Sequence, residues 1–267
     1  MSVAANNLEN NHILLKQVKS GVASLILNRP GQYNALSGEL LSALQEALDD
    51  IAGDDSVKVV IIGARGKAFC AGHDLKELRS SDDHSFHLDL FERCSRMMLS
   101  INRLPQPVVA SVNGIATAAG CQLVAACDLA VVAETARFAV SGINVGLFCS
   151  TPAVPLSRSM LRKHAMKMLL TGDFIDAETA RRFGLVNDVV PDAGLEKATR
   201  ELAEKIAAKS RLAVRTGKKM FYKQLEMSME DAYGFACETI VNNMDSIDAR
   251  EGIDAFIEKR KPAWPDH

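Results

Sequence analysis

Residues 107–126 read PVVASVNGIATAAGCQLVAA, and this stretch decides how we interpret the fold. Residues 107–112 are predicted to form a strand, which the turn pair Asn113-Gly114 ends. Residues 119–126 are predicted to form a short helix whose start carries only small side chains. The free backbone N–H groups at such a start can stabilise negative charge that develops on a ligand.

Two further segments have the same character. AFCAGHDLK at residues 68–76 follows the apolar run 57–63, and SGINVGL at residues 141–147 follows another expected strand. Gly72 permits a sharp turn and lets a ligand approach the backbone closely. Each segment alone is also explained by a tight turn that packs against a strand. Their order and spacing together indicate a ligand site.

The rest of the chain predicts an α/β core at residues 1–190 and a helical region at residues 191–267. Pairs of strands alternate with helices about every 40–50 residues, and the run 57–63 is typical of a strand buried on both faces. No strand is indicated beyond about residue 190, and Ser228 and Asp231 predict a capping box. The expected strands are 13–19, 22–28, 57–63, 107–112 and 128–133, and the expected helices are 36–51, 86–102, 119–126, 194–209, 212–225, 229–243 and 246–260.

Composition excludes several classes of protein. The net charge is -2, from 31 basic and 33 acidic residues, and aromatic residues make up only 5% of the 267 residues, so no nucleic-acid partner is expected. None of the six cysteines lies in a C-x-x-C pair, so no metal site is expected. No apolar run is long enough to predict a transmembrane helix, so no membrane partner is expected either. Residues 1–12 are not typical of a signal or transit peptide, which predicts a cytoplasmic protein, or one of the mitochondrial matrix if a leader has been removed.

The segments together resemble the crotonase superfamily, the enoyl-CoA hydratases and isomerases. The similarity covers nearly the whole chain, from Asn28-Arg29-Pro30 and Asn34-Ala35-Leu36 to residues 251–261. It implies an α/β fold, a spiral of ββα units, with a C-terminal helical region that assembles a homotrimer or a dimer of trimers. Residues 116–122 and 146–152 most resemble a mitochondrial group known as enoyl-CoA-hydratase-domain-containing proteins.

The resemblance also implies a ligand and residues that bind it. The ligand is a coenzyme A thioester, as substrate or bound molecule, and no permanently bound cofactor is expected. The family's oxyanion hole consists of two backbone N–H groups, which correspond here to those of His73 and Ala119. The positions that correspond to its coenzyme A contacts are Leu36, Ala71, Lys76 and Lys259.

The chain departs from the family at its acid–base positions. Hydratases use two glutamates, and the corresponding residues here are Gln122 and Gly142. Related hydrolases and dienoyl isomerases place an acidic residue where this chain has Ser150. An amide cannot take up a proton near pH 7, so the usual hydration chemistry is expected to be very slow.

Two functions remain open on the sequence. The first is an enzyme of this family, acting on an unknown acyl-CoA with a relocated acid or base. The second is an acyl-CoA-binding pseudoenzyme or regulatory module with little turnover. A serine hydrolase is disfavoured because no G-x-S-x-G elbow occurs. A nucleophile from the cluster Cys149, Ser150 and Thr151 is disfavoured because no histidine lies near it in sequence.

Overall fold

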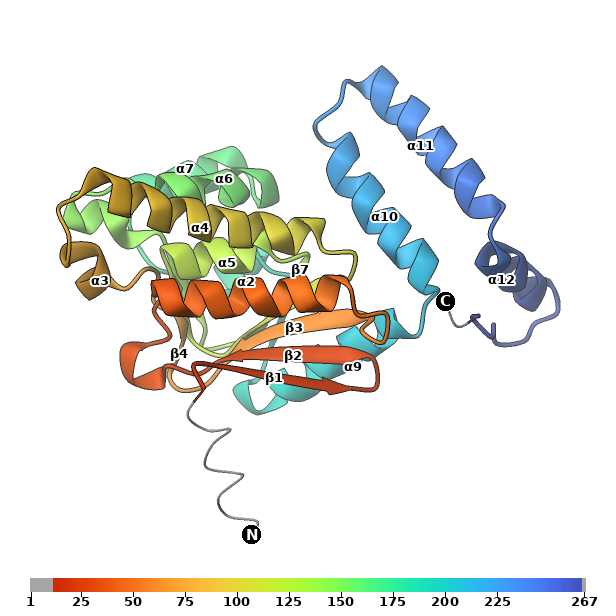
Figure 1. Ribbon diagram of the computed structural model, residues 1–267, viewed down its shortest axis with the longest axis horizontal. Helices are drawn as coiled ribbons and strands as arrows, with labels where there is room; N and C mark the ends of the chain where they lie inside the picture. The colour runs from red at the N-terminus through yellow and green to blue at the C-terminus, as the bar shows by residue number, and fades with distance from the viewer. Residues whose placement is uncertain (1–11, 266–267) are drawn as a thin grey trace, which may run out of the picture.

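The computed structural model describes residues 12–265 and contains two β-sheets with helices packed around them (Figure 1). The first sheet has six strands in the order β1-β2-β3-β5-β7-β10, and the second has four in the order β4-β6-β8-β9. Pairing is parallel except between β1 and β2 and between β8 and β9. The strands are β1 Leu14–Lys19, β2 Val22–Leu27, β3 Val59–Ala64, β4 Ala68–Cys70, β5 Val108–Val112, β6 Ile115–Thr117, β7 Leu129–Ala133, β8 Arg137–Ala139, β9 Ile175–Asp176 and β10 Asp188–Val190.

The order of the strands confirms the predicted spiral of ββα units. β3, β5 and β7 each add to the first sheet, and β4, β6 and β8, which directly follow them, each add to the second. Each turn then continues into helical structure that leads back to the first sheet. The repeat is less regular than the expected 40–50 residues, because the helix of the second turn has 8 residues whereas the main helix of the first has 20.

The helices cover both faces of the first sheet. The α-helices are α2 Gly38–Ala52, α3 Leu75–Arg79, α4 His84–Arg103, α5 Ala119–Ala126, α6 Ser150–Ser159, α7 Arg162–Thr171, α8 Ala177–Phe183, α9 Leu195–Ala207, α10 Arg211–Gln224, α11 Met229–Met244 and α12 Ile247–Ile257. Short 3-10 helices are η1 Pro30–Gln32, η2 Ser141–Val145 and η3 Asp192–Gly194.

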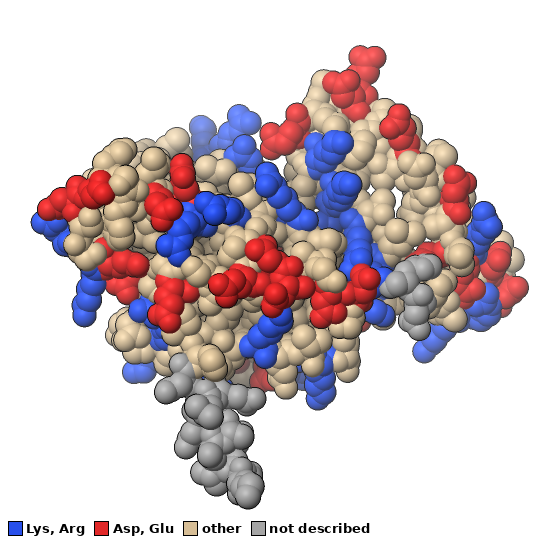
Figure 2. Space-filling model, in the orientation of Figure 1, with Lys and Arg blue, Asp and Glu red and all other residues tan. Residues whose placement is uncertain are grey.

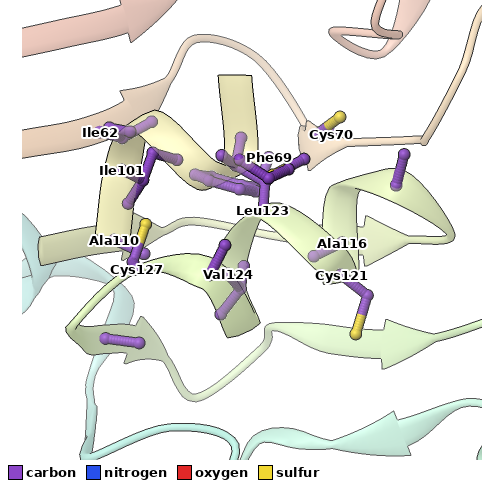
Figure 3. Close-up of a cluster of buried hydrophobic side chains, with 14 of the residues drawn as sticks. Ile62, Phe69, Cys70, Ile101, Ala110, Ala116, Cys121, Leu123, Val124 and Cys127 are labelled. Carbon is purple, nitrogen blue, oxygen red and sulfur yellow. The ribbon is translucent and has the colours of Figure 1, made fainter. Parts of the chain in front are cut away.

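The strand β3 shows why both faces are buried. Val60 and Ile62 pack into the main core with α2, α4 and α5, whereas Val59 and Ile61 pack into a second cluster with α9. Successive side chains of a strand point to opposite faces, so an unbroken apolar run is what two covered faces require. Figure 3 shows the main core beside the site, where Phe69 of β4 and Leu123 of α5 meet.

The C-terminal helices α10, α11 and α12, which we call the arm, extend away from this core (Figure 1). The strands end at Val190 as predicted, but the next helix α9 packs on the first sheet through Leu195 and Ala203. The boundary predicted at residue 190 therefore moves to about Ser210, because α9 supplies the cover for one face of the sheet. Half of the predicted capping box is confirmed, since the Ser228 hydroxyl accepts a hydrogen bond from the Asp231 N–H, while the Asp231 carboxylate accepts one from the Ser228 hydroxyl.

Candidate functional site

The first part of the site is the turn after β4. The Leu36 N–H donates to the Gly72 carbonyl at 2.8 Å, and the Asp74 N–H donates to the Leu36 carbonyl at 3.2 Å. These two bonds make a parallel bridge between Leu36 and His73. In a parallel bridge the residue between the two bonded residues, here His73, directs its own N–H away from the bridge. The His73 N–H is therefore directed away from Leu36, and it has no hydrogen-bond partner within residues 12–265.

The second part is the start of α5. Ala118 precedes the helix with φ 49° and ψ -118°, a backbone conformation that residues other than glycine rarely adopt. Its N–H donates to the Ala139 carbonyl at 3.0 Å, and the Gln122 N–H closes the first helical turn at 3.0 Å. Ala119 is the first helical residue, and in the described part of the chain its N–H has no acceptor. Such a group is free to bind an anion or a developing oxyanion.

The two parts are in contact. A Cβ atom added at Gly72 would lie 2.9 Å from the Ala118 Cβ and 3.3 Å from the Ala119 nitrogen. The Thr117 hydroxyl donates to the Ala71 carbonyl at 3.0 Å and ties the strands together. Because the segments approach so closely, the structure brings the predicted donors His73 and Ala119 to the same place.

The close packing also explains why position 120 is a glycine, whereas positions 118 and 119 are alanines. A Cβ at Gly120 would overlap the Cys70 carbonyl of β4, whereas Ala118 and Ala119 have room for a methyl group. Only position 120 therefore excludes every side chain.

The His73 imidazole is part of the same place. Its ring meets the ring of Phe91 on α4 edge-on, with centroids 5.0 Å apart. Both ring nitrogens are shielded from solvent, and within residues 12–265 neither makes a hydrogen bond of ordinary geometry, although the Leu36 backbone lies close enough to the ring to oppose the effect of burial on its pKa. Burial lowers the pKa of the imidazole to about 4, so the ring is neutral near pH 7.

The two predicted acid–base positions differ in their surroundings. Gln122 is 3% exposed, and its Oε1 atom is buried without a partner among residues 12–265. A Cβ at Gly142 would lie 2.7 Å from the Cys149 Sγ and 2.8 Å from the Leu147 carbonyl oxygen. The loop thus folds over Gly142, and no side chain fits there unless the loop moves.

The cysteine and hydroxyl groups nearby are poorly suited to attack a substrate. Burial raises the pKa of the Cys149 thiol, although the Gly142 backbone opposes this, and burial raises the pKa of Cys121 to about 12. The Ser150 hydroxyl is exposed and donates back to the Phe148 carbonyl at 3.3 Å.

The four predicted coenzyme A residues do not lie together in one chain. Ala71 and Lys76 are exposed next to the Gly72 turn, where a ligand can reach them. The Leu36 side chain is fully buried in the core, so only its main chain could meet a ligand. Lys259 follows α12, which lies on the opposite side of the molecule from α3 (Figure 1). Within one chain it is therefore remote from the other three residues.

The sequence did not predict that Phe91 packs against His73, or that the Cys149 Sγ lies against Gly142. Phe91 lies inside an amphipathic helix and carries no local signal of a site. The contact of Cys149 with Gly142 depends on how the loop after β8 folds back. Among the described residues no cluster of three or more histidine, cysteine or acidic side chains could hold a metal. No helix within residues 12–265 is long and apolar enough to cross a membrane.

Comparison with known proteins identifies the family. The sequence profile described as enoyl-CoA hydratase/isomerase matches residues 17–267, and the chain belongs to this family. The chain is 47% identical over 246 residues to "Enoyl-CoA hydratase domain-containing protein 3, mitochondrial" from Rattus norvegicus, covering 92% of this chain and 82% of that protein. The resemblance to the mitochondrial group is thereby confirmed.

Solved structures agree on the fold. An enoyl-CoA hydratase from Mycobacterium smegmatis is 53% identical, with a TM-score of 0.94 over 95% of this chain and 99% of that chain. Human enoyl Coenzyme A hydratase domain-containing protein 3 is 45% identical, with a TM-score of 0.92 over 95% of this chain and 100% of that chain. The crotonase-type fold predicted from the sequence is therefore confirmed.

Proposed function

We propose that this chain binds an acyl-coenzyme A thioester and holds its carbonyl oxygen with the backbone N–H groups of His73 and Ala119. The observation that carries the proposal is that both donors lack a partner in the described residues and that their segments touch at Gly72. A thioester carbonyl gains negative charge when the neighbouring carbon loses a proton, and two fixed donors stabilise that enolate. Membership of the enoyl-CoA hydratase/isomerase family supports the coenzyme A ligand.

We further propose that the chain lacks the paired carboxylates of the hydratases and has atypical or weak activity. Gln122 is a neutral amide, which can orient a water molecule but cannot accept its proton near pH 7. Gly142 has no side chain, and Cys149 occupies the space where one would begin. The oxyanion donors alone stabilise an enolate and move no proton. An acyl-CoA-binding module with little turnover shares this pocket and is the alternative.

The test combines binding with turnover. In calorimetry, crotonyl-CoA should bind more tightly than crotonate, because only the thioester offers both the carbonyl and the coenzyme A moiety. Equal and negligible affinity for both would end the proposal. Hydration of crotonyl-CoA, followed at the enoyl absorbance, should be several orders of magnitude slower than in a hydratase with two glutamates. This estimate rests on about 10²–10⁴ in rate for each positioned acid or base. Turnover at the ordinary rate would show that another group replaces them.

Restoring the carboxylates should succeed at one position only. Gln122→Glu keeps nearly the same side-chain volume, so we expect it to raise the hydration rate. Gly142→Glu should not raise it further, because its Cβ would overlap the Cys149 Sγ and the Leu147 carbonyl. A large gain from Gly142→Glu would mean that the loop at 141–149 opens readily.

We also propose a homotrimer, or a dimer of trimers. A groove of about 1560 Å³ separates the arm from the core, and its lining runs from Gln122 and Thr151 to Phe221 of α10. It is larger than the pockets that usually enclose one small molecule. A neighbouring copy could cover this groove and could bring its own Lys259 toward the site. Light scattering at micromolar concentration should give three or six times the chain mass, and a monomer would contradict this.

The sequence leaves two compartments open. We propose a mitochondrial location, because the relatives from rat and human are named as mitochondrial proteins. Fractionation of the native cell, with the protein detected by antibody, would decide between the matrix and the cytoplasm.

A further inference from the structure

One stretch of the chain is basic although the chain as a whole is slightly acidic. Residues 135–172 contain no aspartate or glutamate, whereas the net charge of all 267 residues is -2. The basic residues of this stretch are Arg137, Arg158, Arg162, Lys163 and Lys167. Figure 2 shows basic side chains on the part of the surface where Figure 1 places α6 and α7. Such a local excess of positive charge favours a negatively charged partner.

The outward face of α7 combines these cations with apolar side chains. Met166 is 51% exposed and Leu170 is 59% exposed. Residues four apart are neighbours on a helix, so Met166 and Leu170 form one row, and Lys163 and Lys167 form a second row beside it. The opposite face of the helix packs on the core through Ala165, Met168 and Leu169. An exposed apolar row flanked by lysines is typical of a helix that lies on a lipid surface.

The cations of this face have no partner within the chain. Among residues 12–265, Arg162, Lys163 and Lys167 make no ion pair and no side-chain hydrogen bond. Acidic residues on other elements are already paired, since Glu226 binds Arg158 and Glu178 binds Arg181. The folded chain therefore leaves these three charges available for an external anion.

The position of the face separates it from the groove that we propose a neighbouring copy covers. Of α7, only Arg162 lines that groove in the described part of the chain. The row of Met166 and Leu170 and the row of lysines lie outside it. A neighbouring copy that fills the groove therefore leaves these two rows without a partner.

We propose that the outward face of α7 docks the protein on the surface of an anionic lipid bilayer. Lys163 and Lys167 bind the headgroup phosphates, and Met166 and Leu170 insert between the headgroups. Leu161 and Phe174, 67% and 44% exposed, lie at the two ends of the helix and add apolar surface. The sequence predicted no membrane partner because no apolar run could span a bilayer, but contact with the surface needs no spanning helix.

The experiment is co-sedimentation of the full chain with vesicles. One set contains phosphatidylcholine alone, and the other contains equal amounts of phosphatidylcholine and phosphatidylglycerol. The wild type should bind the anionic vesicles and not the neutral ones, and salt should weaken the binding. The double variant Lys163→Gln, Lys167→Gln should bind about 25-fold more weakly, from about fivefold for each cation near an anionic surface. Leu170→Ser should weaken the binding about fivefold, through the lost apolar contact.

The matched control is the double variant Lys205→Gln, Lys209→Gln. These lysines are also exposed, are also four residues apart, and carry the same charge. They lie on or next to α9, which covers the other face of the first sheet. The control should bind anionic vesicles within about twofold of the wild type, because charges far from the surface are screened.

Four outcomes would overturn the proposal. Two are wild-type binding that is absent, or equal for the two kinds of vesicle. Equal weakening by the two double variants would reduce the effect to net charge. A fall in mass by light scattering in Lys163→Gln, Lys167→Gln would assign this face to a contact between copies. Binding that Leu170→Ser leaves unchanged would mean that the face binds any polyanion and does not enter the bilayer.

Discussion

The core and the arm bury their apolar side chains in different ways. In the core, α2 alone buries seven residues, and β2 and β3 are almost wholly inaccessible. In the arm, neither α10 nor α11 has a buried residue, and large side chains such as Phe256 at 85% and Met229 at 78% are exposed. Exposed apolar surface of this kind supports the proposed contact with a neighbouring copy. The core buries its apolar side chains within one chain, whereas no residue of α10 or α11 is buried.

The joint between the two regions is polar. Lys218 and Tyr222 of α10 bind Asp128 at 2.6 and 2.8 Å, and Arg215 binds Asp55 at 3.1 Å. Figure 2 shows basic side chains along α10 beside acidic ones along α2, with both signs mixed over this face. No residue of the arm belongs to either hydrophobic core cluster of the described residues, so we expect the position of the arm to depend on these charged contacts.

The largest expected effect is the difference in stability between a glycine substitution in the core and one in the arm. Gly120→Ala would place a methyl group into the Cys70 carbonyl, whereas Gly217→Ala on α10 meets nothing within 4 Å. We expect Gly120→Ala to lower the free energy of unfolding by more than about 3 kcal/mol, or to prevent folding. Gly217→Ala should raise it by up to about 1 kcal/mol, because alanine favours a helix. Denaturant titration of both variants measures the contrast.

A loss of stability in Gly217→Ala would be informative. It would mean that α10 packs closely against another copy at this point, so the arm would be interior in the assembly. Equal small effects in both variants would contradict the close approach of α5 to β4.

The next largest effect concerns the joint. The Lys218 side chain is 6% exposed, and its ammonium group binds Asp128 and also donates to the carbonyls of Ile101 and Gln106. Lys218→Met leaves the buried Asp128 carboxylate without its cation, which typically costs about 3–5 kcal/mol. Thermal unfolding should therefore shift strongly, and limited proteolysis should cut more readily near residue 210.

Lys219→Met is the matched control, because Lys219 is the exposed neighbour on the same helix. We expect it to change the free energy of unfolding by less than about 0.5 kcal/mol. Similar effects of the two substitutions would mean that the ion pair with Asp128 does not hold the arm.

The contrast between core and arm was only partly predictable from sequence. The apolar run 57–63 correctly predicted a strand buried on both faces. The Asp128 carboxylate accepts a hydrogen bond from the Val108 N–H at the start of the neighbouring strand. The strands of the second sheet were missed because β4, β6 and β8 have three residues each, too few to show a period. The proposed oxyanion donors, His73 and Ala119, could be predicted by resemblance because they are main-chain groups. The overlap at Gly142 could not, because it depends on a contact with Cys149 across a loop.

A smaller effect should appear as the pH falls. Burial lowers the pKa of His73 in the core from 6.5 to about 4, so the unfolded chain binds a proton there before the folded one does. The stability of the core should therefore be complete above pH 6.5 and decline by at most about 3 kcal/mol as the pH falls to 4. Residues 210–265 contain no histidine. The hydrogen bonds from Arg260 hold the pKa of Glu251 at about 2, so this part of the arm should lose stability only at lower pH.

Denaturant titrations at pH 7 and pH 4.5 would measure this decline. His73→Phe removes the titrating group, so its stability should change less between the two pH values than that of the wild type. An identical decline in both proteins would assign the pH dependence to other groups.

The smallest effect tests strain in the core. Ala118 has a φ of 49°, whereas the next residue, Ala119, begins a regular helix. Glycine adopts a positive φ without steric cost, so Ala118→Gly should raise the free energy of unfolding by about 1 kcal/mol. Ala119→Gly should lower it by about 0.5–1 kcal/mol, because glycine disfavours a helix. The two changes are chemically identical and adjacent, so opposite signs in denaturant titration isolate the backbone conformation as the cause. If both substitutions destabilise the protein, the Ala118 methyl group contributes more through its packing against Gly72 than its backbone strain removes.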